Sequence, residues 1–139
     1  MVLVDTNIWS LAFRRRHDSL SLQEKELVEE WRRLARGLQA TLIGPVQQEV
    51  LSGVRTLGDF AKLQWALSGF EDLTILQDDY DRAAAFFNTC QSRGVTGGDI
   101  DMLICAVAVR NAVPVFTTDA DFTLYAEHLP IRLHTPETH

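Results

Sequence analysis

The chain opens with Val-Leu-Val-Asp-Thr-Asn-Ile-Trp at residues 2–9, where a short apolar run passes straight into an acid and then into a helix-like apolar pattern. A short apolar run is typical of a buried strand, and the apolar residues after it recur at helical spacing. We therefore expect a buried strand that turns directly into a helix. Asp5 lies at this junction, just past the carboxyl end of the strand.

The same alternation of short apolar runs and longer amphipathic stretches continues along the chain. Further strands are expected at Ala40–Ile43, Leu73–Leu76, Val113–Thr117 and Ile131–Leu133. Helices are expected from Ser21 to about Gly37, from Pro45 onward, over Leu57–Leu67, from Asp79 to about Gly94, over Asp99–Asn111 and over Phe122–Glu127. Strands that alternate with helices imply parallel, right-handed crossovers. The predicted fold class is α/β: a three-layer α/β/α sandwich around a mostly parallel sheet of about five strands.

Several helix ends are marked by their residue types. Ser21 with Glu24 matches the capping box, in which each side chain accepts from the other residue's backbone amide. Pro45 suits the first turn of a helix, where its missing amide is not needed. Gly94 suits the left-handed turn that often follows a helix.

Size and composition predict one soluble domain. The chain has 139 residues, 46% of them hydrophobic, which is enough for one buried core, so residues 1–139 are expected to form a single domain. No apolar run approaches the roughly 18 residues of a membrane span, and the opening has no secretory pattern, so a cytoplasmic location is expected. The net charge of −6 argues against binding nucleic acid by bulk charge. A local basic run at Arg14, Arg15 and Arg16 remains a candidate RNA-binding patch.

Acidic residues follow the predicted strands or open the helices after them. They are Asp5, Glu49, Asp101, Asp119 and Asp121. Because the carboxyl ends of parallel strands share one edge of a sheet, these distant carboxylates are expected to converge on one crevice. Gathered carboxylates repel one another unless a cation or protons neutralise them, and oxygen ligands suit Mg²⁺ or Mn²⁺. Taken singly, each acid could also be a helix cap or a dipole partner.

Four segments follow one another along the chain: residues 2–9, Gln48–Gly53, Arg93–Thr96 leading to Asp101, and Val115–Phe122. Together they resemble the PIN-domain ribonucleases, and more narrowly the VapC-type toxins of toxin–antitoxin pairs. The resemblance covers nearly the whole chain in the right order. One departure is Cys105, which stands where the family usually has alanine after its third acid.

The resemblance implies a PIN-like fold and a metal-dependent endoribonuclease that hydrolyses RNA phosphodiesters with one or two Mg²⁺ or Mn²⁺ ions. The family's four acids would be Asp5, Glu49, Asp101 and Asp119, with Asp121 assisting. Further candidates beside the metal are Thr6, Asn7, Thr117, Thr118 and Asp99. The resemblance also implies an RNA substrate, a small antitoxin protein that silences the toxin, and a homodimer.

Two other classes of function stay open from the sequence. A receiver-like signalling domain also gathers acids around Mg²⁺, but it needs a lysine after a late strand. Lys25 and Lys62 both fall in predicted helices, which counts against that class. A PIN-like module that binds without catalysis is the second alternative, although all the expected acids are present.

Overall fold

The computed structural model describes the whole chain except residues 14–15 and 137–139. Two of the three arginines of the candidate basic run, Arg14 and Arg15, therefore lie outside the described residues. Arg16 is exposed, with its guanidinium 4.0 Å from the carboxylate of Asp18. Within the described residues, no helix is both long and apolar enough to cross a membrane.

Strands and helices alternate along the chain. The strands are β1 (Val2–Val4), β2 (Ala40–Leu42), β3 (Glu71–Asp72) and β4 (Val115–Phe116). The helices are α1 (Thr6–Phe13), a 3₁₀ turn (His17–Ser19), α2 (Leu22–Arg36), α3 (Gly44–Leu51), α4 (Leu57–Leu67), α5 (Gln77–Ser92), α6 (Asp99–Asn111) and α7 (Asp121–Ala126). This order confirms the predicted α/β class.

The sheet is parallel, with strand order β3-β2-β1-β4. Leu3 of β1 pairs with Thr41 of β2 on one side and with Val115 of β4 on the other. The chain leaves β1 toward one neighbour and reaches the other neighbour only much later, so the order reverses between β1 and β4. Open parallel sheets bind ligands at such a point, outside the carboxyl ends of the strands.

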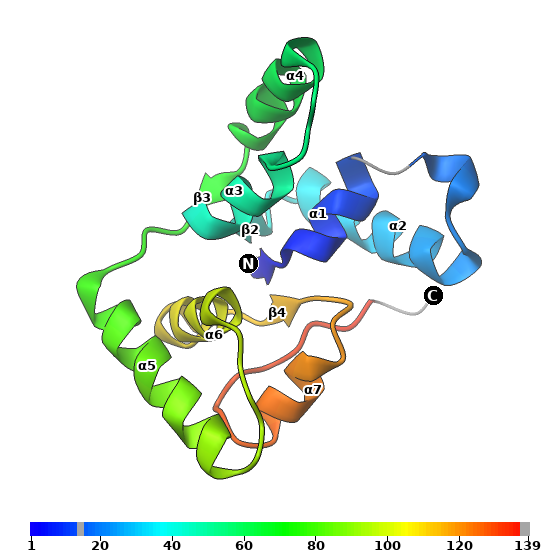
Figure 1. Ribbon diagram of the computed structural model, residues 1–139. Helices are drawn as coiled ribbons and strands as arrows, with labels where there is room; N and C mark the ends of the chain where they lie inside the picture. The colour runs from blue at the N-terminus through cyan, green and yellow to red at the C-terminus, as the bar shows by residue number, and fades with distance from the viewer. Residues whose placement is uncertain (14–15, 137–139) are drawn as a thin grey trace.

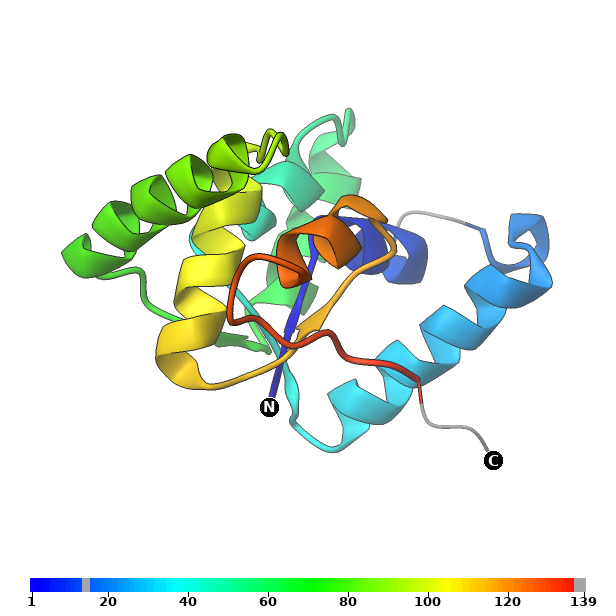
Figure 2. The same cartoon turned by 90° about the horizontal axis from the view of Figure 1, so that it is seen from below.

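Helices cover both faces of the sheet, with α5 and α6 on one side and α1 and α2 on the other (Figures 1 and 2). Helix α4 stands at the edge of the molecule beyond α3 (Figure 1). β1, β2 and β4 are buried, whereas the edge strand β3 is exposed. The apolar side chains of the buried strands pack with those of α6, where Ile104 to Val107 are fully enclosed. Burial on both faces explains why β1 reads as a continuous apolar run rather than an alternating one.

Trp9 anchors α1 against the first strand. Its side chain is fully buried, and its indole Nε1 donates to the carbonyl oxygen of Val4 at 2.9 Å. The ring also packs edge-on against Trp31 of α2 and Phe70. The first helix is thereby fixed relative to the strand before it, which sets the direction of the Asp5 junction between them.

The third strand differs from the prediction, which placed it over Leu73–Leu76. The observed strand ends at Asp72, although the amide of Leu73 still donates to the carbonyl of Leu42 at 2.8 Å. Leu76 instead caps α5, because its backbone amide donates to the carboxylate of Asp79 at 2.8 Å. The backbone amide of Leu76 is therefore used by the helix cap, and the apolar residues before it do not continue the strand.

The last predicted strand is reduced to a single bridge. Leu133 pairs in parallel with Val115, and the sheet proper has four strands rather than about five. The segment is held in part by Glu30 of α2, which is buried and accepts from both Arg33 and His134. Two backbone hydrogen bonds also join the segment to β4, from Val115 to Arg132 at 2.9 Å and from His134 to Val115 at 2.8 Å.

Candidate functional site

Asp5 is the first residue after β1, and its carboxylate is almost entirely enclosed. Oδ1 accepts from the backbone amide of Thr6 at 2.7 Å, and Oδ2 accepts from the Thr117 hydroxyl at 2.8 Å. Burial raises the pKa of Asp5, the hydrogen bonds from Thr117 and Thr6 lower it, and the charges of Glu49 and Asp119 raise it again. The carboxylate is thus held in one orientation but is costly to ionise.

The loop after β4 is tied to the same place. The Thr117 hydroxyl that donates to Asp5 also accepts from the backbone amide of Asp119 at 3.0 Å. The Asp119 carboxylate in turn accepts from the amide of Asp121 at 2.9 Å, which opens α7. One threonine therefore joins acids that are more than a hundred positions apart in the sequence.

Asn7 makes a second link between the first turn of α1 and the loop after β4. Its amide nitrogen lies 3.4 Å from Oδ2 of Asp5 and 3.3 Å from the hydroxyl of Thr117. Its amide oxygen accepts from the backbone of Thr118 at 3.2 Å. Asn7 and both threonines, which sequence reasoning placed beside the site, thus form its hydrogen-bonded frame.

Glu49 approaches the site from α3. Its side chain is exposed, and Oε1 accepts from the Thr6 hydroxyl at 2.8 Å. Thr6 also donates its backbone amide to Asp5, so one residue orients both carboxylates. This arrangement places the Thr6 side chain between the first and second acids of the predicted set.

Asp101 comes from the first turn of α6 and is half-buried. Desolvation by burial raises its pKa to about 6, and the charges of Asp5, Asp119 and Asp121 add to this shift. These charge effects relate Asp101 to Asp5, Asp119 and Asp121 at the carboxyl edge of the sheet.

Tyr125 is a site residue that sequence reasoning missed. It is buried, it lies in α7, and its hydroxyl donates to Oδ2 of Asp101 at 2.9 Å. Burial raises the pKa of the Tyr125 hydroxyl, and the bond to Asp101 raises it further. Its only sequence signal is the spacing of one helical turn from Asp121.

Gly97 explains how the start of α6 reaches this position. A Cβ at Gly97 would lie only 2.6 Å from the terminal methyl of Met102, the end of a flexible side chain, so a residue other than glycine there would require Met102 to change its conformation. Glycine allows the close approach. The loop consequently packs onto the first turn of α6, next to Asp101.

Asp99 faces elsewhere. It is exposed and lines a groove between α5 and α6 together with Tyr80 and Leu103. Residues two apart on a helix point about 200° away from each other, which separates Asp99 from the acids that Asp101 joins. The sequence candidate Asp99 is therefore not part of the hydrogen-bonded frame around Asp5.

The acids gather without forming a closed cage. In the described part of the chain, no three Asp, Glu, His or Cys side chains are placed to hold one ion between them. The carboxylates still fit Mg²⁺ in chemistry, since Mg²⁺ keeps several waters and is usually held by one or two carboxylates plus substrate phosphates. The raised pKa values of Asp5 and Asp101 further show that nearby positive charge would relieve an energetic cost at this place.

Comparison with known proteins gives a consistent family match. The model of the PIN domain family matches residues 2–128. Two curated proteins are each 29% identical over 128 residues, covering 91% of this chain and 92% of theirs: VapC ribonuclease Mb1587 of Mycobacterium bovis and ribonuclease VapC11 of Mycobacterium tuberculosis.

Solved structures share the fold. VapBC2 from Rickettsia felis, bound to a DNA fragment from its promoter, matches with a TM-score of 0.75 and 19% identity over 96% of this chain and 98% of that one. FitAcB from Neisseria gonorrhoeae matches with a TM-score of 0.70 and 17% identity over 98% of both chains. A toxin–antitoxin complex from Klebsiella pneumoniae matches with a TM-score of 0.64 and 22% identity over 88% of this chain and 90% of that one.

Proposed function

The chain belongs to the PIN domain family, and from this premise we propose that it is a metal-dependent endoribonuclease and the toxin of a toxin–antitoxin pair. The observation that carries the proposal is the frame in which Thr117 bonds to both Asp5 and Asp119 at the point where the strand order reverses. Curated relatives that match over nearly their whole length are named ribonucleases, which supports RNA as the substrate.

We assign the cation to the carboxylates of Asp5, Glu49, Asp101 and Asp119, with Asp121 assisting, as one or two Mg²⁺ or Mn²⁺ ions. When bound, such an ion supplies a nucleophilic water and neutralises charge on the phosphate oxygens. Thr6, Asn7, Thr117 and Thr118 fix the orientation of the acids through the hydrogen bonds described above. Partners that orient metal ligands in this way typically contribute 10–100-fold in metal affinity or activity.

The remaining features of the proposal concern partners. Structural neighbours include toxin–antitoxin complexes, which supports a small antitoxin protein as partner. A cytoplasmic location, a single domain over residues 1–139 and a homodimer remain part of the proposal. An exposed Arg16, with the neighbouring arginines, would attract the RNA backbone toward an otherwise acidic crevice.

The experiment that tests the function is cleavage of single-stranded RNA by the purified protein with Mg²⁺, with Mn²⁺ or with chelator. Cleavage products are expected only when a divalent cation is present, because the carboxylates alone offer the RNA phosphates nothing but repulsion. Cleavage that survives chelation would refute the metal mechanism. Cation-bound protein that binds RNA without cutting it would favour the non-catalytic alternative.

Cation binding is expected to stabilise the protein more as the pH rises. Because folding raises the pKa of Asp101 from 3.8 to about 6, the folded state binds more protons than the unfolded state in that interval. Stability without metal therefore falls as the pH rises through this window, and Asp5 acts in the same direction. Mg²⁺ competes with those protons, so its stabilising effect should be larger at pH 7 than at pH 4.5.

This pH effect can be measured by thermal unfolding with and without Mg²⁺, comparing the native chain with Asp101→Asn. Without metal, the variant should gain stability relative to the native chain as the pH rises from 4.5 to 7. Asp99→Asn, an exposed change two residues away, serves as the matched control. A Mg²⁺ effect of equal size at both pH values would contradict the assignment.

Tyr125→Phe is expected to reduce the rate of RNA cleavage by about 10-fold and to lower the apparent affinity for Mg²⁺. The change removes only the hydroxyl that donates to Asp101, so the carboxylate loses its fixed orientation while the ring still fills its place. The apparent affinity for Mg²⁺ separates this positioning role from a purely structural one. Tyr80→Phe, on the exposed face of α5, should change neither quantity.

A further inference from the structure

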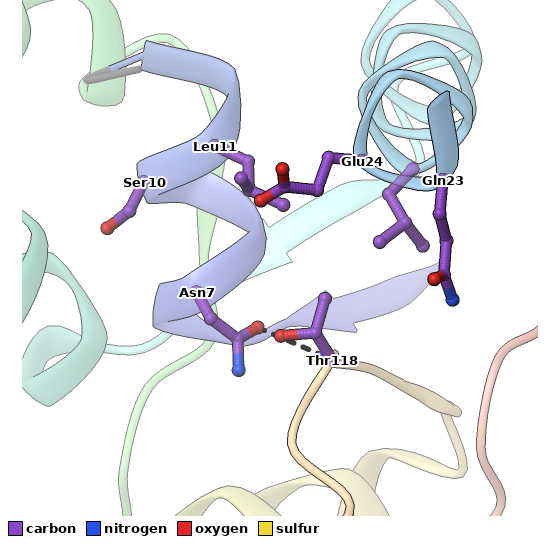
Figure 3. Close-up of a pocket in the computed structure, with 7 residues that line it drawn as sticks. Asn7, Ser10, Leu11, Gln23, Glu24 and Thr118 are labelled. Carbon is purple, nitrogen blue, oxygen red and sulfur yellow. Dashed lines mark hydrogen bonds between the residues drawn. The ribbon is translucent and has the colours of Figure 1, made fainter. Parts of the chain in front are cut away.

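A pocket of about 500 Å³ opens beside the acidic site, between α1 and α2. Its volume falls in the range of about 300–1,000 Å³ typical of small-molecule sites. Asn7 and Thr118 form the wall nearest the acids, and Figure 3 shows the hydrogen bond that joins them. The amide nitrogen of Asn7 also contacts Asp5, so the side chain of Asn7 alone separates the pocket from the proposed cation site.

The pocket combines an apolar surface with a polar rim. Leu11 of α1 and Leu27 of α2 supply the apolar part. Glu24 extends from the start of α2 toward Leu11, with Gln23 beside it, whereas Ser10 lies at the edge of the pocket with its side chain directed away from α2 (Figure 3). A flat group with an apolar face and a hydrogen-bonding edge matches this combination.

The charge of the rim decides which part of an RNA would enter. Glu24 places a carboxylate in the pocket, and its Oε1 already accepts from the backbone amide of Ser21 at 3.0 Å. A carboxylate is negatively charged and only accepts hydrogen bonds, so it repels a phosphate and cannot donate to it. The amino groups of bases, in contrast, donate to carboxylates, and amide side chains such as that of Gln23 both donate and accept.

We propose that this α1–α2 pocket (Ser10, Leu11, Gln23, Glu24 and Leu27, closed by Asn7 and Thr118) binds one unpaired nucleobase of the RNA, adjacent to the phosphate at the acidic site. The inference rests on the proposed ribonuclease function and deepens it. Single-stranded RNA is read mainly through splayed bases that pack on side chains and bond through their edges. Asn7 then couples the position of the base to that of Asp5, since it borders both sites.

The test uses a single-stranded RNA whose cleavage site has been mapped, with one abasic nucleotide placed at each position in turn. Binding is measured by fluorescence anisotropy with Ca²⁺ in place of Mg²⁺, so that affinity is read separately from cleavage. Because one net hydrogen bond corresponds to about a 5-fold change in affinity, removing the base should weaken binding by about 5- to 10-fold. We expect such a loss at one position next to the cleaved bond.

Two variants then connect that position to the pocket. Gln23→Trp replaces an exposed pocket-lining side chain with a large ring that occupies the pocket, and it should make the native and abasic RNAs bind equally. Gln23→Ala removes only an exposed amide. It should reduce the difference in affinity between RNAs that carry different bases at that position. Ser68→Trp and Gln64→Ala, both exposed at α4, are matched controls that should leave the profile unchanged.

Identical abasic profiles in the native chain, Gln23→Trp and Gln23→Ala would overturn the proposal. It would also be overturned if the variants left RNA binding intact but weakened binding of the antitoxin, because a protein segment would then be the occupant. Absence of metal-dependent cleavage by the native chain refutes the ribonuclease function itself. That result is recorded in a separate assay, so the two failures can be told apart.

Discussion

Asp101→Asn is expected to lower the rate of RNA cleavage by about 100-fold or more while the fold stays intact. A metal ion contributes several kcal/mol of transition-state stabilisation, and each 1.36 kcal/mol corresponds to a factor of ten in rate. The amide keeps the size of the side chain and can still accept from Tyr125, whose hydroxyl lies 2.9 Å from the carboxylate. It removes the negative charge that the proposed cation needs.

The rate is measured under single-turnover conditions with saturating Mg²⁺, and the fold is checked by circular dichroism and thermal unfolding. Asp99→Asn is the matched control, since it removes the same charge from the same turn of α6 but faces the groove toward α5. Equal activity of Asp101→Asn and the native chain would remove Asp101 from the mechanism. Equal losses in both variants would mean that only the overall charge of the helix start matters.

Asp79→Ala is expected to destabilise the fold by about 2 kcal/mol. Losing a helix cap typically costs about 1 kcal/mol and losing hydrogen bonds to a charged group about 1.5–3 kcal/mol. Because Arg110 is 30% exposed and still donates to the carbonyl of Thr74, water and that bond offset part of the loss. The side chain of Asp79 is 1% exposed and accepts from Nε of Arg110 at 2.8 Å and from one of its terminal nitrogens at 2.9 Å. It also caps α5 through the amide of Leu76.

Urea unfolding checks this expectation, with Asp78→Ala, an exposed acid in the same first turn, as the control. The Asp79→Ala/Arg110→Leu double variant should recover part of the loss, because no unpaired charge then remains at the α5–α6 contact. A loss below about 1 kcal/mol for Asp79→Ala would place this pair among the weak surface interactions.

The Asp79 pair also gives stability a dependence on acid. The hydrogen bonds from Arg110 lower the pKa of Asp79, and burial opposes them only in part. The stability that the pair contributes is therefore complete above the ordinary pKa of 3.8 and is lost as the pH falls further. Nothing in the sequence marks Asp79 for this role, since Asp78 beside it looks the same and is exposed.

Local signals in the sequence were read correctly where the structure uses them locally. Ser21 and Glu24 form the predicted capping box, with bonds of 3.0 and 3.1 Å, and Gly94 adopts the left-handed backbone expected of it. The prediction failed at Leu73–Leu76, where a buried carboxylate on α5 takes the amide of Leu76. The observed strand has only two residues, which is too short for an apolar or alternating pattern to reveal it in the sequence.

The order of apolar runs, the acids after them and the punctuation of helix ends established the α/β class, the parallel sheet and the candidate acids from sequence alone. These features depend on the spacing of residues that are close together in the sequence, so they can be read without the structure. Tertiary structure alone decided that Thr117 joins Asp5 to Asp119, that Tyr125 holds Asp101, that Asp99 turns away, and that a pocket lies next to Asn7. Such contacts are made between residues that meet only after the helices have packed on the sheet, so no local pattern encodes them.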